Sequence, residues 1–487
     1  MITWGSPVQF ESLSVQYNWI RCAVLPNGNF VVAYEEYSGT DNGKFGVYDT
    51  SGTEIVTPKD FHANSTSEIE LAVLSTGNFF IFYTDITDSY KGQFVIYNSS
   101  GSLVKAETQF GTDDVHAISA VTVASDKVLV VFRRSLGGGD HNTYYRVINS
   151  DGTFSTGEVE ITGIAAYETI GCLLSDGKVM FIFYDSEDAN KTKYMIRNAD
   201  GTSSIQPITI SATTGHYNTA ILLDNGNVFV CFADTGGADL YFTIIAVNGT
   251  EGIADAGTGA TSLVDDALSA IYTSDAEING WTVYIISGAG SGSSAAVTDY
   301  VAATGTITVA GWSGANPGAG DGYRILPPIA KAVTLVDSDA AQANSSVLDD
   351  GTILVAFRDS NTNYGEYIIY NEDGTVAQAA SNFNEAYTIP GREQARSGDF
   401  YFVPYLGADQ DGYFQIYTLS AALLYIRYAT ATGVEYAKAE ELNGHIVRTV
   451  KNGIIYGIPL VAVDDADASS IRVFDGSSIK AFVKQEI

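Results

Sequence analysis

The chain has 487 residues, of which 12% are aromatic and only 17% are charged, with 49 glycines and 10 prolines. This composition favours many short strands joined by tight turns and disfavours helices. Acidic residues outnumber basic ones by 57 to 25, a formal net charge of −32, which argues against nucleic-acid binding because phosphate contacts depend on Lys and Arg.

The N-terminal residues MITWGSPVQFES lack the basic start and apolar run of a signal peptide. No apolar stretch is long enough to cross a bilayer, so membrane insertion is not expected. The three cysteines, Cys22, Cys172 and Cys231, are too few for a disulfide framework and are expected to pack as small apolar groups.

A hairpin pattern recurs along the chain with a period of about fifty residues. Each copy has an apolar run, a short polar turn and a second run rich in Val, Phe and Tyr. The copies are RCAVLPNGNFVVAYEE, ELAVLSTGNFFIFYTD, AVTVASDKVLVVFRR, GCLLSDGKVMFIFYD, AILLDNGNVFVCFAD and SSVLDDGTILVAFRD. Asn-Gly and Asp-Gly permit the positive φ angles of a tight turn, so each copy is predicted to be a β-hairpin.

A third strand and a glycine-marked turn follow each hairpin, and the pattern continues beyond the last one. The glycines are Gly52, Gly101, Gly152, Gly201, Gly252, Gly374, Gly433 and Gly476. With the extended stretch after each turn, the repeat has four strands, which is typical of a propeller blade. We therefore predict an all-β fold, a β-propeller of eight blades, with seven as the alternative if the last two degenerate repeats merge.

The interval between Gly252 and Gly374 is much longer than the others and changes in composition to Ala, Gly, Ser and Thr. Segments such as WTVYIIS and TITVAGW alternate like strands, although a flexible linker is the alternative. We predict five blades in residues 1–255, a small inserted β-barrel-like domain in 256–330, and three blades in 331–487. The N-terminal strand is expected to close the ring.

An acidic residue recurs eight positions after the turn glycine in five hairpins, where the second strand ends. These candidate ligand residues are Glu36, Asp85, Asp185, Asp234 and Asp359, and the third hairpin has Arg134 instead. Equivalent positions lie at the same end of a propeller, so the carboxylates could form a circle that binds cations. The alternative is that each carboxylate accepts N–H bonds from its own loop.

Tyrosines in or beside the loops after the second strand offer flat faces for stacking on sugars, with core packing as the alternative. They are Tyr37, Tyr90, Tyr144, Tyr145, Tyr364 and Tyr367. His116 and His216 occupy roughly equivalent places in two repeats, which points to repeat architecture more than to a metal site.

Catalytic motifs are absent from the sequence. There is no GxSxG elbow, HExxH helix or phosphate loop, and too few arginines for a sialidase-like site. No acidic cluster matches the twelve-residue calcium loop. We therefore expect no enzymatic activity and no dedicated cofactor, with opportunistic Ca²⁺ binding left open at GADQDG and VDDADASS.

The inserted segment resembles a module that recurs in virion proteins of tailed bacteriophages, including tail and fibre components. The matching residues are Asn279, Gly280, Ile285, Ser287, Gly288, Gly290, Gly292, Thr298, Asp299, Tyr300, Ile307, Thr308, Val309, Trp312, Pro317, Asp321, Tyr323 and Ile325. The propeller repeats also look similar to those of predicted phage tail fibres. The resemblance implies a structural virion protein and carries no catalytic residue with it.

Three roles follow as expectations. The first is a tail-fibre or tail-tip protein, homo-oligomeric in the virion, that contacts other virion proteins and attaches to a host-surface glycan or protein. The second is a head-decoration protein or a head–tail connector or nozzle protein, whose acidic surface tolerates nearby DNA without binding it. The third is a lectin or glycan-processing enzyme with its site at the propeller centre.

Overall fold

The computed structural model describes residues 2–16, 19–37, 41–112, 114–135, 141–161, 164–212, 214–234, 239–391, 394–397, 400–419, 424–430, 433–442, 446–451, 454–462, 470–474 and 479–485, with side chains within residues 4–418. The chain divides into two compact units: Ser6–Ile416, and Met1–Gly5 together with Tyr417–Ile487. Antiparallel strands make up almost all the regular structure of the described residues, which confirms the all-β fold class.

All six predicted hairpins are present. Their strands are β3 (Arg21–Val24) with β4 (Phe30–Glu35), β6 (Glu54–Val73) with β7 (Asn78–Asp85), β10 (Val115–Ala124) with β11 (Lys127–Ser135), β14 (Ala166–Leu173) with β15 (Val179–Asp185), β18 (His216–Leu222) with β19 (Val228–Ala233), and β28 (Ala340–Val347) with β29 (Ile353–Asp359). Turn glycines such as Gly28 and Gly77 have φ angles of 86° and 88°, a backbone region that glycine adopts without steric cost.

A third and a fourth strand complete each hairpin into a four-stranded sheet. The third strands are β5 (Asn42–Tyr48), β8 (Lys91–Asn98), β12 (His141–Asn149), β16 (Lys191–Arg197), β20 (Leu240–Ile245) and β30 (Gly365–Tyr370). The fourth strands are the first half of β6, then β9 (Leu103–Gly111), β13 (Val159–Ile161), β17 (Ser203–Ser211), β27 (Lys331–Asp337) and β31 (Val376–Asn384). Because β6 serves two successive sheets, the first two sheets join into one of seven strands.

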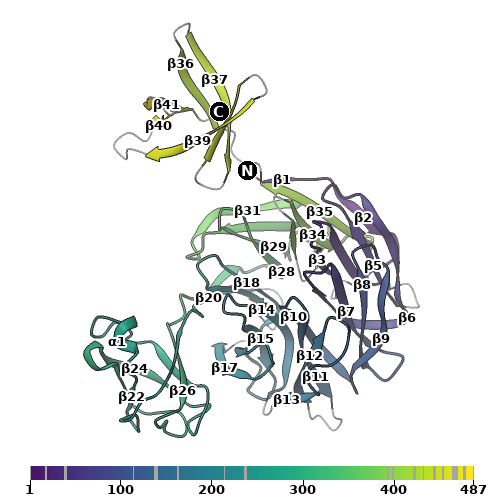
Figure 1. Cartoon of the computed structure of the whole chain (residues 1–487). Helices are drawn as coiled ribbons and strands as arrows, with labels where there is room; N and C mark the ends of the chain where they lie inside the picture. The colour runs from purple at the N-terminus through teal and green to yellow at the C-terminus, as the bar shows by residue number, and fades with distance from the viewer. Residues whose placement is uncertain are drawn as a thin grey trace. The chain divides into compact units, whose positions relative to one another are not determined.

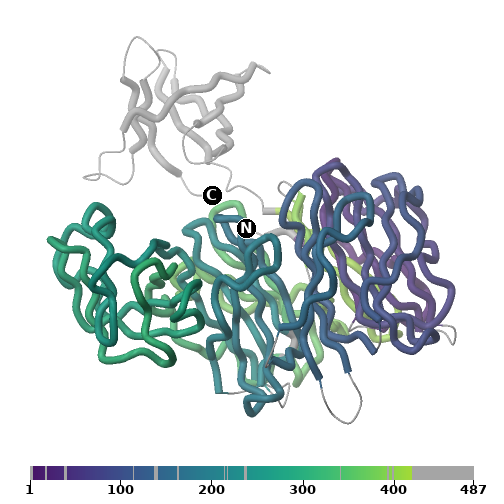
Figure 2. Tube along the Cα trace, turned by 60° about the horizontal axis from the view of Figure 1, so that its bottom comes forward, coloured from purple at the N-terminus to yellow at the C-terminus, as the bar shows by residue number. Residues whose placement is uncertain are grey.

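The sheets follow one another around a common centre in chain order (Figures 1 and 2). The innermost strands β3, β6, β10, β14, β18 and β28 contact one another in that order. Apolar side chains of neighbouring sheets fill the space between them, as where Phe82 and Phe94 share a core cluster with Val130 and Phe132. This is the packing of a β-propeller, in which each sheet buries its faces against its neighbours.

The last sheet of the ring is built from both ends of the propeller unit. It contains β32 (Ile389–Pro390), β33 (Ala395–Ser397), β34 (Phe400–Leu406) and the first part of β35 (Gly412–Leu419), with which β2 (Val8–Glu11) pairs. Strand β1 (Ile2–Trp4) pairs with Tyr417–Leu419 at the end of β35, within the other unit. Strand β33 contacts β3 of the first sheet, so the ring closes there.

A repeated pair of residues identifies β2 as the fourth strand of that sheet. In three other sheets a glycine at or near the start of the third strand is covered by a phenylalanine ring of the fourth strand: Gly43 by Phe61, Gly92 by Phe110, and Gly365 by Phe383. In the last sheet Gly412 is covered by Phe10, although the two lie at opposite ends of the sequence. The N-terminal strand therefore takes the place of the missing fourth strand.

In the propeller unit the described strands thus form six four-stranded units and the closing sheet of β2 and β32–β35, and the last two predicted repeats fall outside them. Strands β36 (Leu424–Thr430), β37 (Gly433–Leu442), β38 (Ile446–Lys451), β39 (Ile454–Ala462), β40 (Ser470–Phe474) and β41 (Ile479–Gln485) form a closed barrel. Gly433 begins a barrel strand, and Gly476 lies outside the described residues. Residues 331–487 therefore contain the last part of the ring and a separate barrel. The sequence pattern does not distinguish the two, because alternating strands occur both in propeller blades and in barrels.

The inserted domain lies inside the fifth sheet, between its third strand β20 and its fourth strand β27. Its strands are β21 (Thr250–Ile253), β22 (Ser262–Val264), β23 (Thr282–Ile285), β24 (Ser294–Val301), β25 (Thr306–Val309) and β26 (Gly322–Leu326), with the short helices α1 (Leu268–Ile271) and η2 (Ala302–Thr304). The sheet order is β21-β26-β23-β24-β25-β22, and just after β21 the backbone N–H of Asp255 donates to Val264 O, at the end of β22, at 2.6 Å. The domain has its own buried core, so it is not a flexible linker.

The insertion also begins earlier than predicted. Gly252 lies in β21, which pairs with β26, and is therefore not the turn of a fifth blade. The inserted domain contacts the fourth sheet: Lys178 Nζ lies 2.9 Å from Glu251 Oε1, and Arg324 Nη2 lies 3.4 Å from Asp176 Oδ2. Among the described residues, no helix has the length and apolar character required to cross a membrane.

Candidate functional site

The predicted acidic residues occupy equivalent places in the propeller. Three of them, Asp85, Asp185 and Asp359, are the last residues of second strands. Asp185 and Asp359 pair with the first residue of the neighbouring innermost strand, and Asp85 pairs with Thr66 within β6. Glu36 follows β4 and forms a bridge with Val15. The predicted common position is therefore present in the sheets.

Most of these carboxylates bind their own loops. Asp85 Oδ1 accepts N–H bonds from Thr87 (2.9 Å) and Asp88 (3.1 Å), and Asp359 Oδ1 accepts them from Asn361 (2.7 Å) and Thr362 (3.2 Å). Such bonds are typical of aspartate at the start of a turn.

Asp185 also accepts an N–H bond from its own loop, from Glu187 at 3.1 Å, and lysines contact two of the predicted carboxylates. Lys193 Nζ lies 2.9 Å from Asp185 Oδ2, and Lys44 forms an ion pair with Glu36. The backbone N–H of Asp234 donates to Asp239 O at 3.0 Å. These contacts fit the loop alternative better than a shared circle of cation ligands.

A different feature brings polar and aromatic side chains together: a β-bulge near the start of the innermost strands. The register shifts between Ser67 and Glu70, between His116 and Ser119, between Tyr167 and Ile170, between His216 and Thr219, and between Ala341 and Asn344. Non-glycine residues take left-handed φ angles there: 53° at Glu68, 50° at Ala117, 50° at Glu168 and 48° at Gln342. A bulge re-aims side chains, and such backbone strain is concentrated at functional sites.

Three of these bulges surround a small cavity of about 50 Å³. Its walls include Trp19, Glu68, His116, Arg133, Tyr167 and Glu168, which we name the inner-face cluster. The volume exceeds that needed for one water molecule. The cluster combines two aromatic rings with acidic and basic groups contributed by successive sheets.

Contacts within the inner-face cluster hold its cationic groups in place. The Arg133 guanidinium lies 4.0 Å from the centre of the Tyr167 ring, and its Nη1 lies 2.8 Å from His141 Nδ1. His116 lies 3.0 Å from Asp114 Oδ1 and 3.5 Å from Glu68 Oε1. Burial lowers the pKa of His116, but Glu68 and Asp114 outweigh it, so the pKa lies above its ordinary value of 6.5. The cluster is therefore rich in fixed hydrogen-bond donors.

An arc of aromatic rings continues from the cluster to the fifth sheet. Tyr167 stacks on Tyr184, with ring centres 5.1 Å apart and planes 14° apart, and Tyr184 lies 5.2 Å from the ring of His216. His116 and His216 precede equivalent bulges, and Tyr167 has that place in the sheet between them. The similarity of the two histidine positions was therefore a signal for this arc. Tyr167 has no such signal in the composition or in any sequence motif.

Of the tyrosines predicted to face sugars, some are exposed and others are not. Tyr37 and Tyr90 are exposed, and Tyr90 lies 5.8 Å from His116. Tyr144, Tyr145 and Tyr367 are buried and pack in the core, because their strand positions point between sheets.

The residues that carry the virion-module resemblance maintain the fold of the inserted domain. The Asp321 carboxylate accepts N–H bonds from Ala289 (3.0 Å) and Gly290 (2.9 Å). Trp312 Nε1 donates to Gly259 O at 2.9 Å, and Tyr323 is fully buried. The resemblance thus rests on framework residues and not on a binding site.

No family model matches the chain, and no curated protein matches it. Among solved structures, a protein of unknown function from Dyadobacter fermentans DSM 18053 is similar, with a TM-score of 0.43 and 10% identity over 86% of this chain and 99% of that one. A neuraminidase-like protein from A/bat/Guatemala/164/2009 gives 0.38 and 10%, covering 73% and 88%. SapL1 lectin in complex with alpha methyl fucoside gives 0.37 and 11%, covering 75% and 97%. Similarity this remote says nothing about ligand or activity.

One buried carboxyl beside the predicted acidic positions is expected to destabilise the protein at alkaline pH. Glu35 is only 4% exposed, and its Oε2 has no hydrogen-bond partner among the described residues. Burial, with the charge of Asp41, raises the pKa of Glu35 to about 8. The unfolded chain releases this proton near pH 4.5, so stability is lost between that pH and about 8.

Glu35→Gln removes this cost while keeping the side-chain shape. We expect the variant to be more stable than the native chain by about 1–3 kcal/mol at pH 9 and equal to it near pH 4. Urea denaturation at the two pH values measures the difference. A variant that is no more stable at pH 9 than the native chain contradicts the prediction.

Proposed function

We propose that the chain is a non-enzymatic structural protein of a tailed-bacteriophage virion that attaches to a host-surface glycan through the inner-face cluster. The observation that carries the proposal is the composition of that cluster around a cavity. Aromatic faces stack on the apolar faces of sugar rings, while Arg133, His116 and the two glutamates supply donors and acceptors for hydroxyl groups.

The charge of the chain narrows the ligand class. A formal net charge of −32 repels polyanionic polymers at moderate salt. A neutral glycan is not repelled by this charge and can bind through local hydrogen bonds and stacking. The proposed ligand is therefore a neutral host-surface glycan, and the arc of Tyr167, Tyr184 and His216 provides the surface over which it extends beyond the cavity.

The virion setting is supported by the inserted domain. The residues that carry the resemblance keep their order along the segment, and three of them, Asp321, Trp312 and Tyr323, form hydrogen bonds within the inserted domain. The domain is spliced between two paired strands of one sheet, so it adds a surface for contacts with other virion proteins without interrupting the ring.

Tyr167→Ala tests the attachment role. The substitution removes the ring on which Arg133 stacks and one wall of the cavity, so we expect binding to host cells and to neutral glycans on an array to fall at least about tenfold. Tyr364→Ala is the matched control, because this tyrosine lies in the loop after β29, outside the cluster. Equal binding by the two variants counts against the site.

Two further measurements separate the proposed function from its alternatives. Cryo-electron microscopy of the virion is expected to place the chain at the distal end of the tail. Density on the capsid lattice or around the DNA exit channel would make it a decoration or connector protein. Release of sugar from host envelope by the purified chain, lost in Glu68→Gln or Glu168→Gln, would make it a glycan-processing enzyme.

A further inference from the structure

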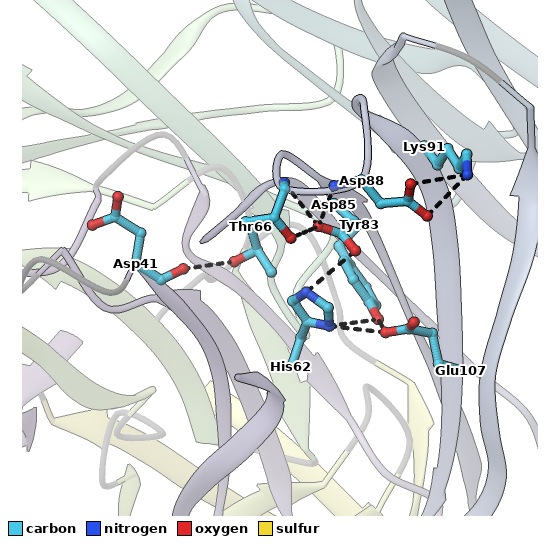
Figure 3. A network of polar contacts seen from close by, with 9 residues as sticks. Asp41, His62, Thr66, Tyr83, Asp85, Asp88, Lys91 and Glu107 are labelled. Carbon is cyan, nitrogen blue, oxygen red and sulfur yellow. Dashed lines mark hydrogen bonds and ion pairs between the residues drawn. The ribbon is translucent and has the colours of Figure 1, made fainter. Parts of the chain in front are cut away.

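A second polar cluster lies apart from the inner-face cluster, where β6 passes from the first sheet to the second. It consists of His62 from β6, Asp85 at the end of β7 and Glu107 from β9 (Figure 3). One ligand atom from each of the three residues lies within 4.8 Å of the others. The His62 and Asp85 side chains are only 8% and 7% exposed.

Glu107 fixes the orientation of the imidazole. His62 Nδ1 lies 2.8 Å from Glu107 Oε2, and the Tyr83 hydroxyl donates to the same oxygen. With Nδ1 as the donor, the other nitrogen, Nε2, carries a lone pair. A carboxylate that accepts the Nδ1–H of a histidine is the usual second partner of a histidine that binds a metal through Nε2.

His62 Nε2 points toward an available carboxylate oxygen. It has no hydrogen-bond partner among the described residues, and it lies 3.5 Å from Asp85 Oδ2. The other oxygen of Asp85, Oδ1, is occupied by N–H bonds from Thr87 and Asp88. This contact is an ion pair only when the imidazole is protonated. A separation of 3.5 Å is longer than an ordinary hydrogen bond. It is close to the roughly 3.3–3.5 Å between two ligands that bind one Zn²⁺ at about 2.0–2.1 Å with tetrahedral geometry.

We propose that His62 Nε2 and Asp85 Oδ2 bind one Zn²⁺ or a similar divalent transition metal, with Glu107 as the residue that positions His62. Water completes the coordination. The imidazole ligand distinguishes this site from a calcium site, which takes oxygen ligands only. The metal would link β6 at its crossing between two sheets to the loop after β7.

Zinc titration of the full chain tests the site. After chelator treatment and dialysis, the native chain is expected to bind one Zn²⁺, measured by calorimetry with zinc chloride, and to bind no Ca²⁺ at this site. His62→Gln is expected to abolish binding, and Asp85→Asn to weaken it at least about 100-fold. Glu107→Gln is expected to weaken it about 10–100-fold. Absence of zinc binding by the native chain overturns the proposal.

The control variant is Asp359→Asn. Asp359 makes the same kind of loop bonds as Asp85 in another sheet, so it reports the effect of losing those bonds without the histidine. We expect it to bind zinc like the native chain and to melt like Asp85→Asn in chelator. Zinc binding that persists in His62→Gln, or falls equally in Asp359→Asn, overturns the site. Complete loss in Glu107→Gln overturns the positioning role of Glu107.

Discussion

Phe10→Ala is expected to lower the free energy of unfolding of the propeller by about 3–5 kcal/mol, the usual cost of truncating a buried phenylalanine. Phe10 is 5% exposed and packs in the core of the closing sheet, 4.9 Å from the Tyr34 ring. Its ring covers Gly412, so the truncation also loosens β2 from β35. Urea denaturation measures the loss, and proteolysis within the first 15 residues reports the loosened strand.

Phe110→Ala is the matched comparison, because Phe110 covers Gly92 in the second sheet. A similar loss of stability is expected there, without N-terminal proteolysis. Gly412→Ala tests the contact from the other side, since an added methyl group would overlap the Phe10 ring and cost about 1–3 kcal/mol. That cost is expected to shrink in the Phe10→Ala background. Strictly additive losses would show that the two residues do not contact each other.

Arg21→Met is expected to destabilise the ring by about 3–5 kcal/mol because it leaves a buried carboxylate without its charged partner. Arg21 Nε lies 2.9 Å from Glu70 Oε2, and the two side chains are 5% and 8% exposed. The pair joins β3 to β6, which are the innermost strands of the first and second sheets. Thermal and urea denaturation measure the loss.

The double variant Arg21→Met, Glu70→Leu decides whether the charge or the packing matters. Replacing both partners by apolar residues of similar size is often neutral or stabilising. We therefore expect the double variant to recover most of the stability lost in Arg21→Met. A double variant as unstable as the single one would mean that the arginine acts through packing of its stem and not through the ion pair.

Much of the fold could be predicted because its signals are local. Asn-Gly and Asp-Gly turns between runs rich in Val, Phe and Tyr specify hairpins, and every predicted hairpin is present. The pairing of Gly412 with Phe10 could also have been found, because Gly43, Gly92 and Gly365 each precede a phenylalanine by the same number of residues. That spacing identifies the fourth strand of a sheet. No phenylalanine follows Gly412 at the same spacing, so the last sheet must take its fourth strand from another part of the chain.

The parts that could not be predicted depend on tertiary packing. A barrel strand such as β37 alternates in the same way as a blade strand, so local periodicity cannot separate them. The sequence of Thr250–Ile253 predicts the turn after the third strand of a blade, but the segment is a strand that pairs with β26. Glu68 and Glu168 have left-handed φ angles that neither residue prefers, so the bulges that build the cavity have no local signature. The repeat pattern marks the acidic position of Asp85 but gives no sign of its proximity to His62.

The position of the inserted domain has a consequence for how such chains diversify. Its first and last strands, β21 and β26, are antiparallel partners, with Thr250 opposite Ile325, so the domain returns the chain to the point at which it left. The flanking strands β20 and β27 stay paired across the gap. When the two ends of a hairpin connection remain adjacent, the residues between them can be replaced by a different segment without disturbing the paired strands. One ring can therefore display different modules at this connection, and replacing residues 250–326 by a two- to five-residue turn should leave a folded propeller.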